Sequence, residues 1–337
     1  MKKYNQTIII AEAGLNHNGS LKRALKMIKV AKNSGADYIK FQTAVPENVV
    51  SKNAKKAKYQ KKNNNDNETQ FAMIKKLHLP LDNYKILKKE CDKNSIKFLS
   101  SSFDIESVLF LKKIGCKIIK IPSGEITNYP YLKVIAKNKF KIILSTGMST
   151  INEIETSLKI LYKFKVKKKN ITLLHCNSAY PTPLNDVNIL AIKKLKNKFK
   201  LEVGFSDHTA GILAPICAVS VGAKVIEKHF TLNKRLKGPD HSSSLNPINF
   251  MQMSKSIRDV EKILGKNEKK ITNSERENIL IVRKSIVAKQ KIIKGQLFSE
   301  TNLTTKRPGS GISPLMWNKY IGRKSKKNYK KDQLINE

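Results

Sequence analysis

The sequence lacks the features that would tie it to a membrane or to a disulfide framework. No apolar run approaches about 18 residues, and the N-terminal stretch MKKYNQTIIIAEAG leads into a strand-like run rather than a signal peptide. The four cysteines, Cys91, Cys116, Cys176 and Cys217, have no CxxC spacing, so they predict neither a zinc knuckle nor disulfides. We therefore expect a cytoplasmic protein without a membrane partner.

Aromatic residues and acidic residues are both scarce. Aromatics make up 7% of the chain, and 66 Lys and Arg residues face 26 Asp and Glu residues, which gives a formal net charge of +40. Basic proteins that bind nucleic acids cluster these charges and interleave them with aromatics. Here the lysines are spread over nearly every predicted helix face. We expect solvated lysine surfaces and no nucleic-acid partner. The positive electrostatic field of these lysines would still favour an anionic substrate.

One unit repeats along the chain: an apolar, β-branched run followed by an amphipathic stretch. Apolar side chains recur at helical spacing in four such stretches, residues 21–35, 105–115, 151–164 and 184–197. Eight such units over about 260 residues predict a (β/α)8 TIM barrel, an α/β fold. The alternative, a doubly wound open sheet, more often has about six strands and a GxGxxG turn, which is missing. The predicted strands are 7–11, 37–41, 97–100, 117–121, 141–144, 171–174, 201–205 and 224–226.

Two segments depart from the repeat. Residues 44–79 include the polar stretch KNAKKAKYQKKNNNDNE before a helix-like QFAMIKKL, which predicts a lid or, alternatively, a tolerated loop. After a predicted helix at 249–265 the pattern changes to short segments without a long helix. We therefore predict a barrel over 1–265, a linker over 266–282 and a small β-rich domain over 283–337 that docks on another surface.

Polar and reactive side chains follow nearly every predicted strand, whereas the opposite strand ends carry little but lysine, aspartate and glycine. Because a barrel's active site lies at the carboxyl ends of its strands, this asymmetry predicts an enzyme. The candidates, in chain order, are Glu12, Lys40, Gln42, Ser101, Lys120, Ser123, Glu125, Ser145, Ser178, Tyr180, Ser206, His208 and His229.

His208 and His229 follow two consecutive predicted strands that are separated by a small-residue helix. Neighbouring parallel strands point the same way, so both imidazoles should emerge at one end of the sheet. That geometry suits one metal ion. The alternative is that each histidine is an ordinary polar residue at a strand end.

Lys40 and Lys120, with several serines, predict a phosphate site, because ammonium groups supply charge and hydroxyls supply directional hydrogen bonds. One alternative is a Schiff base between a lysine and a carbonyl substrate, for which a pair of metal-binding histidines would be superfluous. Another is a surface lysine that extends into solvent. The serines in question are Ser101, Ser123, Ser145 and Ser206.

The motifs AEAGLNHNGS, KFQT, KIPSGE, ILSTGM, HCNSAYPTP, GFSDHT, EKHFTL and KGPDHSSSLNP occur in this order. Through these motifs the chain resembles the sialic acid synthase family, which comprises the N-acetylneuraminate and legionaminate synthases that use phosphoenolpyruvate. The resemblance covers essentially the whole chain, since the segment ending TTKRPGSGISP is similar to the family's antifreeze-like (SAF) domain. It implies a metal-dependent condensation on a TIM barrel, and a domain-swapped homodimer in which each small domain reaches over the partner's barrel.

The resemblance also implies roles for individual residues. His208 and His229 would bind Mn2+, with Mg2+ or Co2+ as alternatives. The metal would polarise the aldehyde oxygen of the open-chain sugar, which the C3 carbon of phosphoenolpyruvate attacks. Water then adds at C2, and Glu12 or Glu125 handles its proton before phosphate leaves by C–O cleavage. The residues that would hold phosphoenolpyruvate are Lys40, Ser101, Lys120, Ser123, Ser145 and Ser206.

The catalytic set implied in this way is Glu12, Glu125, Lys40 and Lys120, although either carboxylate can equally anchor sugar hydroxyls. Arg307, in the KRPG turn, would reach the sugar's N-acetyl group from the partner subunit. The other residues that would face the sugar are Gln42, Ser178, Tyr180 and Asp240.

Departures from the family pattern bear on the substrate. Ser178 stands where some bacterial neuraminate synthases have asparagine, and the run Ser100 to Ser102 replaces a more usual Ser-Thr-Pro. We predict N-acetylmannosamine as the sugar and N-acetylneuraminate as the product. The alternative sugar is 2,4-diacetamido-2,4,6-trideoxymannose, which gives N,N'-diacetyllegionaminate. A more remote alternative is a non-catalytic carbohydrate-binding relative, which would be expected to have lost a histidine or a phosphate-site lysine.

Overall fold

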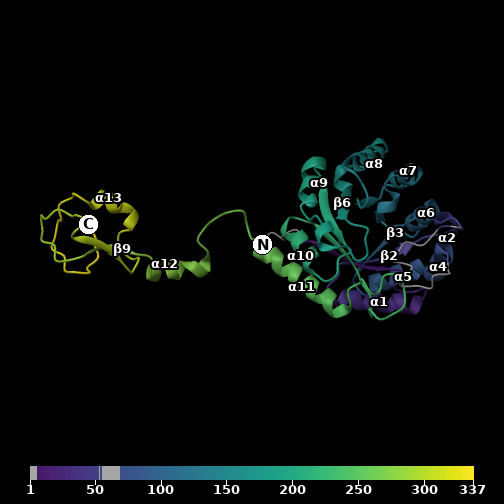
Figure 1. Ribbon diagram of the computed structural model, residues 1–337, viewed down its shortest axis with the longest axis horizontal. Coiled ribbons are helices and arrows are strands. Elements are labelled where there is room, and N and C mark those ends of the chain that lie inside the picture. Colours follow the sequence, from purple (N-terminus) through teal and green to yellow (C-terminus); the bar gives the residue numbers. More distant parts are fainter. Residues whose placement is uncertain (1–5, 53, 55–68) are drawn as a thin grey trace. The chain divides into compact units, whose positions relative to one another are not determined.

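The computed structural model describes residues 6–52, 54 and 69–337 of the chain (Figure 1). The chain divides into two compact units, Met1–Gly265 and Lys266–Glu337. Most of the polar stretch for which a lid was predicted lies outside the described residues. In the described residues, no helix has the length and apolar character needed to cross a membrane.

The first unit is a closed barrel of eight parallel strands, each paired with the next along the chain and β8 paired with β1. The predicted TIM barrel is therefore confirmed, and the open-sheet alternative is wrong. Every predicted strand overlaps an observed one. The strands are β1 (Ile8–Gly14), β2 (Tyr38–Thr43), β3 (Lys97–Ser102), β4 (Ile118–Ile121), β5 (Lys141–Ser145), β6 (Ile171–Cys176), β7 (Glu202–Asp207) and β8 (Val225–His229).

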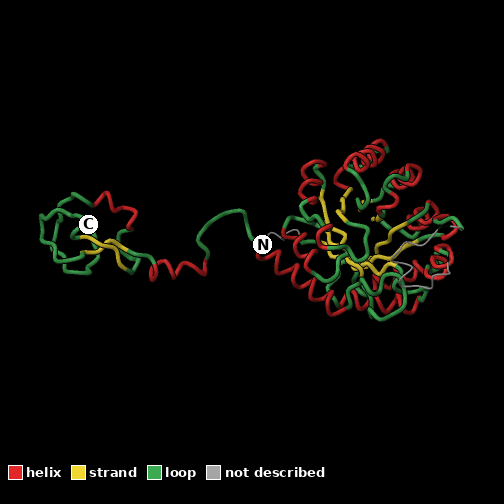
Figure 2. Tube along the Cα trace, in the orientation of Figure 1, coloured by secondary structure: helices red, strands yellow, loops and turns green. Residues whose placement is uncertain are grey.

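Helices surround the barrel, as the red and yellow tubes of Figure 2 show. The predicted helix-like segment QFAMIKKL is helix α4, capped by the Thr69 side chain, which accepts a hydrogen bond from the Ala72 backbone. The helices of this unit are α1 (Leu21–Asn33), α2 (Pro46–Val49), α4 (Gln70–Leu77), α5 (Asn83–Lys93), α6 (Ile105–Lys113), α7 (Tyr129–Lys137), α8 (Ile151–Lys163), α9 (Ala191–Phe199), α10 (Leu213–Ser220) and α11 (Pro247–Ile263).

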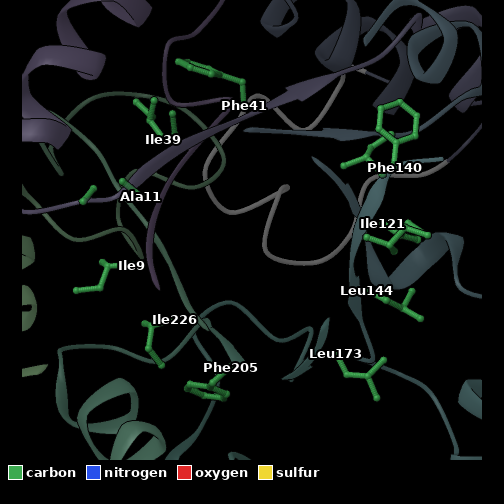
Figure 3. Close-up of a cluster of buried hydrophobic side chains, with 14 of the residues drawn as sticks. Ile9, Ala11, Ile39, Phe41, Ile121, Phe140, Leu144, Leu173, Phe205 and Ile226 are labelled. Atoms are coloured by element: carbon green, nitrogen blue, oxygen red, sulfur yellow. The ribbon is translucent and has the colours of Figure 1, made fainter. Parts of the chain in front are cut away.

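Side chains alternate along each strand between the helix-facing surface and the barrel interior. The outer set, including Ile9, Ile39 and Phe205, belongs to the main hydrophobic core under the helices (Figure 3). A separate apolar layer fills the interior. Its members from the strands are Ile8, Ile10, Tyr38, Leu99, Ile118, Ile143, Leu174 and Val225.

Gly204 on β7 leaves room for this interior layer. A Cβ atom at this position would lie 2.3 Å from the Val225 carbonyl oxygen and 2.7 Å from Cδ2 of Leu174. Both distances are much shorter than a van der Waals contact. Strands β7 and β8 therefore approach each other closely where one side chain is absent.

The second unit has a small core of its own, as expected for a small β-rich domain. Strands β9 (Ser285–Ala288) and β10 (Leu303–Lys306) form an antiparallel pair, and helices α12 (Arg276–Val282) and α13 (Trp317–Tyr320) flank them in the chain. The core residues are Ile286, Ala288, Ile292, Phe298, Leu303, Tyr320, Tyr329 and Ile335.

Candidate active site

A cavity of about 330 Å³ opens at the carboxyl ends of the barrel strands. Its volume falls in the range of small-molecule sites. The strand geometry explains why distant residues meet there, since several polar lining residues stand two positions after a member of the interior apolar layer, as Glu12 follows Ile10 and Lys40 follows Tyr38. The predicted residues that line it are Glu12, Lys40, Gln42, Ser101, Lys120, Ser123, Ser145, Ser178, Tyr180, Ser206, His208, His229 and Asp240.

Two lysines and two glutamates form an ion cluster on the floor of this cavity. Lys40 Nζ lies 2.8 Å from Glu12 Oε2 and 3.6 Å from Glu227 Oε2, and Lys120 Nζ lies 3.0 Å from Glu227 Oε1. All four side chains are at most 5% exposed. Lys40 and Glu12 are cross-strand neighbours in the register of β1 and β2. The two ammonium groups are thus fixed in place, with balancing negative charge, before any ligand enters.

The environment makes the two glutamates unequal. Burial would raise the pKa of Glu227, but the charges of Lys120 and Lys40 hold it at about 2. Burial raises the pKa of Glu12, and the charge of Lys40 only partly offsets this. Glu227 is therefore a permanent anion, whereas Glu12 is the carboxylate better suited to take up and release a proton.

Hydroxyl groups complete the floor. Ser101 Oγ accepts a hydrogen bond of 2.7 Å from Lys40 Nζ, and Ser206 Oγ donates one of 2.9 Å to Glu227 Oε1. Ser123 Oγ accepts from the Gly147 backbone N–H at 3.0 Å. The buried hydroxyl of Ser145 has no hydrogen-bond partner in the described part of the chain. A buried, unpaired hydroxyl in the same cavity as two ammonium groups suits an anionic ligand.

The two histidines converge on one point beside the floor. Tyr180 OH lies 2.8 Å from His208 Nε2 and 3.3 Å from His229 Nε2, and the two imidazole centroids are 5.4 Å apart. His208 Nδ1 bonds the Asn177 carbonyl oxygen, so Nδ1 carries the proton and Nε2 keeps its lone pair. Burial lowers the pKa of His208 to about 4 and that of His229 well below its usual value.

This pair fits a divalent metal ion. Both imidazoles are neutral near pH 7, and their Nε2 atoms face the same position, as ligands of one ion must. Asp240 Oδ2 lies 3.9 Å from His229 Nδ1. Among residues 6–52, 54 and 69–337, no group of three or more His, Cys, Asp or Glu side chains is arranged to hold a metal.

A buried ion pair supports the strand ends that carry the histidines. Lys228, on the outer side of β8, donates hydrogen bonds to Asp207 Oδ2 and to the Thr209 carbonyl oxygen. Asp207 Oδ1 accepts from the Thr209 backbone N–H at 2.8 Å. Both side chains of the ion pair are at most 1% exposed. The turn that presents His208 is therefore tied to the strand that presents His229.

Comparison with known proteins identifies the chain's relatives. The model of the NeuB family matches residues 27–269, and that of the SAF domain matches residues 283–337. The chain belongs to the NeuB family. The SAF match agrees with the small β-rich fold of the second unit.

Two NeuB relatives are similar over nearly their full length, and both are named N,N'-diacetyllegionaminic acid synthase. The one from Campylobacter jejuni is 53% identical over 337 residues, which is 100% of both chains. The one from Legionella pneumophila is 43% identical over 322 residues, covering 95% of this chain and 90% of the relative. A solved N-acetylneuraminic acid synthetase from Leptospira borgpetersenii is 34% identical, with a TM-score of 0.72 over 83% of this chain and 94% of that one.

Two residues of the predicted NeuB site are not among the residues that line the cavity in the described part of the chain. Glu125 Oε2 accepts a hydrogen bond of 2.6 Å from Asn128 Nδ2 in the turn after β4. Arg307 belongs to the second unit, where its Nε donates to the Val282 carbonyl oxygen at 3.0 Å. The geometry therefore favours Glu12 over Glu125 for proton transfer.

The sequence interpretation missed Glu227, which contacts both floor lysines. A signal was available: Glu227 and His229 are two residues apart on one strand, so their side chains share the barrel interior. Apolar residues that line the cavity were also missed. These are Leu15, Val49, Val50, Met73, Ile74, Phe103 and Met148.

Proposed function

We propose that this protein is an N,N'-diacetyllegionaminic acid synthase that condenses phosphoenolpyruvate with 2,4-diacetamido-2,4,6-trideoxymannose. The observation that carries the proposal is the 53% identity, over the full length of both chains, to a relative with that name. The second relative described above bears the same name. The comparisons thus favour the alternative sugar over N-acetylmannosamine, which the sequence interpretation had preferred.

The floor of the cavity suits phosphoenolpyruvate. Lys40 and Lys120 supply two positive charges, and Ser101, Ser145 and Ser206 supply hydroxyls around them. Phosphate and carboxylate groups both favour charge-assisted hydrogen bonds of this kind. Ser123 completes the set that we assign to phosphoenolpyruvate. The two lysines are held by carboxylates, which favours an electrostatic role over a Schiff base.

In the proposed reaction a C–C bond forms between C3 of phosphoenolpyruvate and the aldehyde carbon of the sugar. The aldehyde oxygen becomes a hydroxyl, and water adds at C2 of the former phosphoenolpyruvate. The C2–O bond to phosphate then breaks, so that one water is consumed and one inorganic phosphate is released. Glu12, with its raised pKa, is positioned to accept a proton from that water, while Lys40 and Lys120 stabilise the departing phosphate.

The metal proposed for His208 and His229 is Mn2+, with Mg2+ or Co2+ as alternatives. When bound, it would polarise the aldehyde oxygen and make its carbon more electrophilic. Gln42, Ser178, Tyr180 and Asp240 line the same cavity and would orient the sugar chain against the floor. The retention of both histidines and both lysines argues against a non-catalytic carbohydrate-binding relative.

We further propose a cytoplasmic, domain-swapped homodimer. Helix α12 ends in a strongly apolar run in which Leu280, Ile281 and Val282 are 58%, 65% and 49% exposed. Consecutive exposed apolar side chains of this size favour burial against another surface. In the proposed dimer, Arg307 would contact the sugar's N-acetyl group in the partner's barrel.

The test is phosphate release from phosphoenolpyruvate in the presence of Mn2+, with the two candidate sugars compared side by side. We expect release with the 2,4-diacetamido sugar and little with N-acetylmannosamine. The His208→Ala variant should bind less Mn2+, as followed by the electron paramagnetic resonance signal of the free ion, and should release no phosphate. Failure of the wild-type protein to release phosphate with either sugar would overturn the proposal.

A further inference from the structure

The cavity has a polar floor and an apolar wall near its mouth. We use "apolar wall" for the lining residues Leu15, Val49, Val50, Met73 and Ile74. Leu15 follows β1, Val49 and Val50 lie at the end of α2, and Met73 and Ile74 lie on α4. Four of these side chains are pure hydrocarbons, and Met73 adds only a weakly accepting thioether sulfur. The wall therefore offers a ligand mainly apolar contact, beside the polar lining side chains Gln70 and His78.

The wall is packed rather than loose. Met73 is 2% exposed and Leu15 7% exposed, and both belong to one hydrophobic cluster with Leu77, against which Ile74 packs. An ion pair of 3.1 Å between Lys75 and Glu47 links α4 to α2. The part of the wall formed by Leu15, Met73 and Ile74 is thus packed before a ligand arrives, so ordering that part costs little on binding.

The chemistry of the floor sets the direction in which a sugar must lie. The aldehyde carbon has to reach C3 of phosphoenolpyruvate, which the ion cluster of Lys40, Lys120, Glu12 and Glu227 places at the bottom of the cavity. An open-chain six-carbon sugar bound in this way points its far end, C4 to C6, away from the floor. That end points toward the segments that follow the strand ends, and the residues of the apolar wall lie in such segments after β1 and β2.

The two candidate sugars differ at this far end. The 2,4-diacetamido-6-deoxy sugar has a methyl group at C6 and an acetamido methyl group at C4. N-acetylmannosamine has hydroxyl groups at both places. Burying a hydroxyl without a hydrogen-bond partner is unfavourable, whereas burying a methyl group is favourable.

We propose that the apolar wall selects the sugar, by accepting the C6 methyl and C4 acetamido groups of the 6-deoxy substrate. This inference rests on the proposed function and adds the residues that determine its specificity. Single methyl-sized differences in apolar pockets give selectivities of about 10- to 200-fold in kcat/KM. Val49 and Ile74 are half-buried and are the members best placed to contact a ligand without dismantling the cluster around Met73.

The experiment compares two variants that add a hydroxyl to the wall, Val49→Thr and Ile74→Thr. Val49→Thr keeps the size and branching of the side chain, so it still tests the inference if the Ile74 variant fails to fold. Ile86→Thr on α5 is the matched control, because Ile86 is 46% exposed and is not a lining residue. For each protein, kcat and KM are measured with both sugars at saturating phosphoenolpyruvate and Mn2+.

We expect the ratio of kcat/KM between the 6-deoxy sugar and N-acetylmannosamine to fall about tenfold in the two wall variants. The change should arise mainly in KM for the 6-deoxy sugar, with KM for phosphoenolpyruvate unchanged. A purely structural defect would lower kcat/KM for both sugars alike and leave the ratio of the two values as it is in the wild type. An unchanged ratio with an active wild-type enzyme overturns this inference alone, whereas a wild-type enzyme that uses neither sugar overturns the proposed function as well.

Discussion

Glu227 Oε1 lies 3.0 Å from Lys120 Nζ on the floor of the cavity, and both side chains are at most 5% exposed. The other oxygen of the same carboxylate lies 3.6 Å from Lys40 Nζ. One glutamate thus holds both ammonium groups of the proposed phosphate site. It does so from β8, the strand that also carries His229, so the proposed anion and metal sites share one structural support.

The Glu227→Gln substitution should destabilise the barrel and make it respond to phosphate. Removing one partner from a buried ion cluster costs about 3–5 kcal/mol, because the remaining charges lose compensation. Inorganic phosphate can supply the missing negative charge between Lys40 and Lys120. We therefore expect phosphate to raise the melting temperature of the variant by more than it raises that of the wild type.

Glu261→Gln is a matched control for this measurement. Glu261 pairs with Arg258 at 3.2 Å, is 15% exposed and does not line the cavity. Its loss should lower stability without adding any sensitivity to phosphate. Equal phosphate responses in the Glu227 variant and the wild type would contradict the assignment of the two lysines to an anion site.

The ion pair of Asp207 and Lys228 gives a second prediction. Asp207→Asn leaves a buried ammonium group without its counter-charge, so the free energy of unfolding should fall by about 3–5 kcal/mol. Adding Lys228→Met removes the uncompensated charge and should restore part of the loss. Urea unfolding of the two single variants and the double variant measures the coupling.

An exposed ion pair provides the contrast. Lys85 Nζ lies 2.7 Å from Asp82 Oδ1, with side chains 50% and 83% exposed. Asp82→Asn should change the free energy of unfolding by less than about 1 kcal/mol. A loss from Asp207→Asn as small as this would show that the buried pair does not hold the strand ends together.

Two buried histidines away from the proposed metal site predict acid sensitivity. Burial lowers the pKa of His17 to about 3 and that of His241 to about 4. The unfolded chain, with ordinary histidine pKa values near 6.5, binds more protons than the folded chain below that pH. The stability that these neutral histidines contribute is therefore present above about pH 6.5 and is lost progressively as the pH falls toward 3.

The His17→Gln variant tests this dependence. At a pH of about 4.5 the wild-type protein should have lost about 2–3 kcal/mol through His17 relative to pH 7. The variant should lose correspondingly less over the same interval, as measured by urea unfolding at each pH. Parallel stability profiles for the two proteins would rule out His17 as a source of the acid sensitivity.

Gly204→Ala should destabilise the barrel because its methyl group would meet the Val225 carbonyl oxygen at 2.3 Å. Overpacking of this kind typically costs about 1–3 kcal/mol, and more where backbone must shift. Gly124→Ala adds the same methyl group at a position where, apart from the adjacent residues of the chain, no described atom lies within 4 Å. Comparison of the two melting temperatures isolates the steric effect, and equal values would contradict it.

Much of the fold could be predicted from the sequence, because each strand is a short β-branched run and each helix has an apolar face. The eight strands and the small β-rich domain follow from those patterns. The helix predicted at 184–197 is shorter in the structure, since α9 begins only at Ala191, after a turn in which Asn188 adopts a left-handed conformation. Such a turn leaves little trace in the periodicity of apolar residues.

The site was harder to predict, because burial and pairing depend on contacts between distant strands. The position of a polar residue after a strand correctly indicated Lys40, Lys120 and the histidines as neighbours in one cavity. The same criterion placed Glu125 in the site, although it lies in a turn that points its carboxylate toward Asn128. Conversely, Glu227 was not predicted as a site residue, although it forms ion pairs with both Lys40 and Lys120.

The hydrogen bond from His208 Nδ1 to the Asn177 carbonyl oxygen couples the proposed sugar preference to the proposed metal binding. An engineer would wish to adjust these two properties separately. Asn177 is the residue before Ser178 and lies three before Tyr180, both of which line the cavity. Remodelling this segment to admit a new sugar would move the carbonyl that orients the imidazole. Variants selected for a changed sugar preference should therefore also change in affinity for the proposed metal ion, so sugar preference and metal affinity have to be screened together.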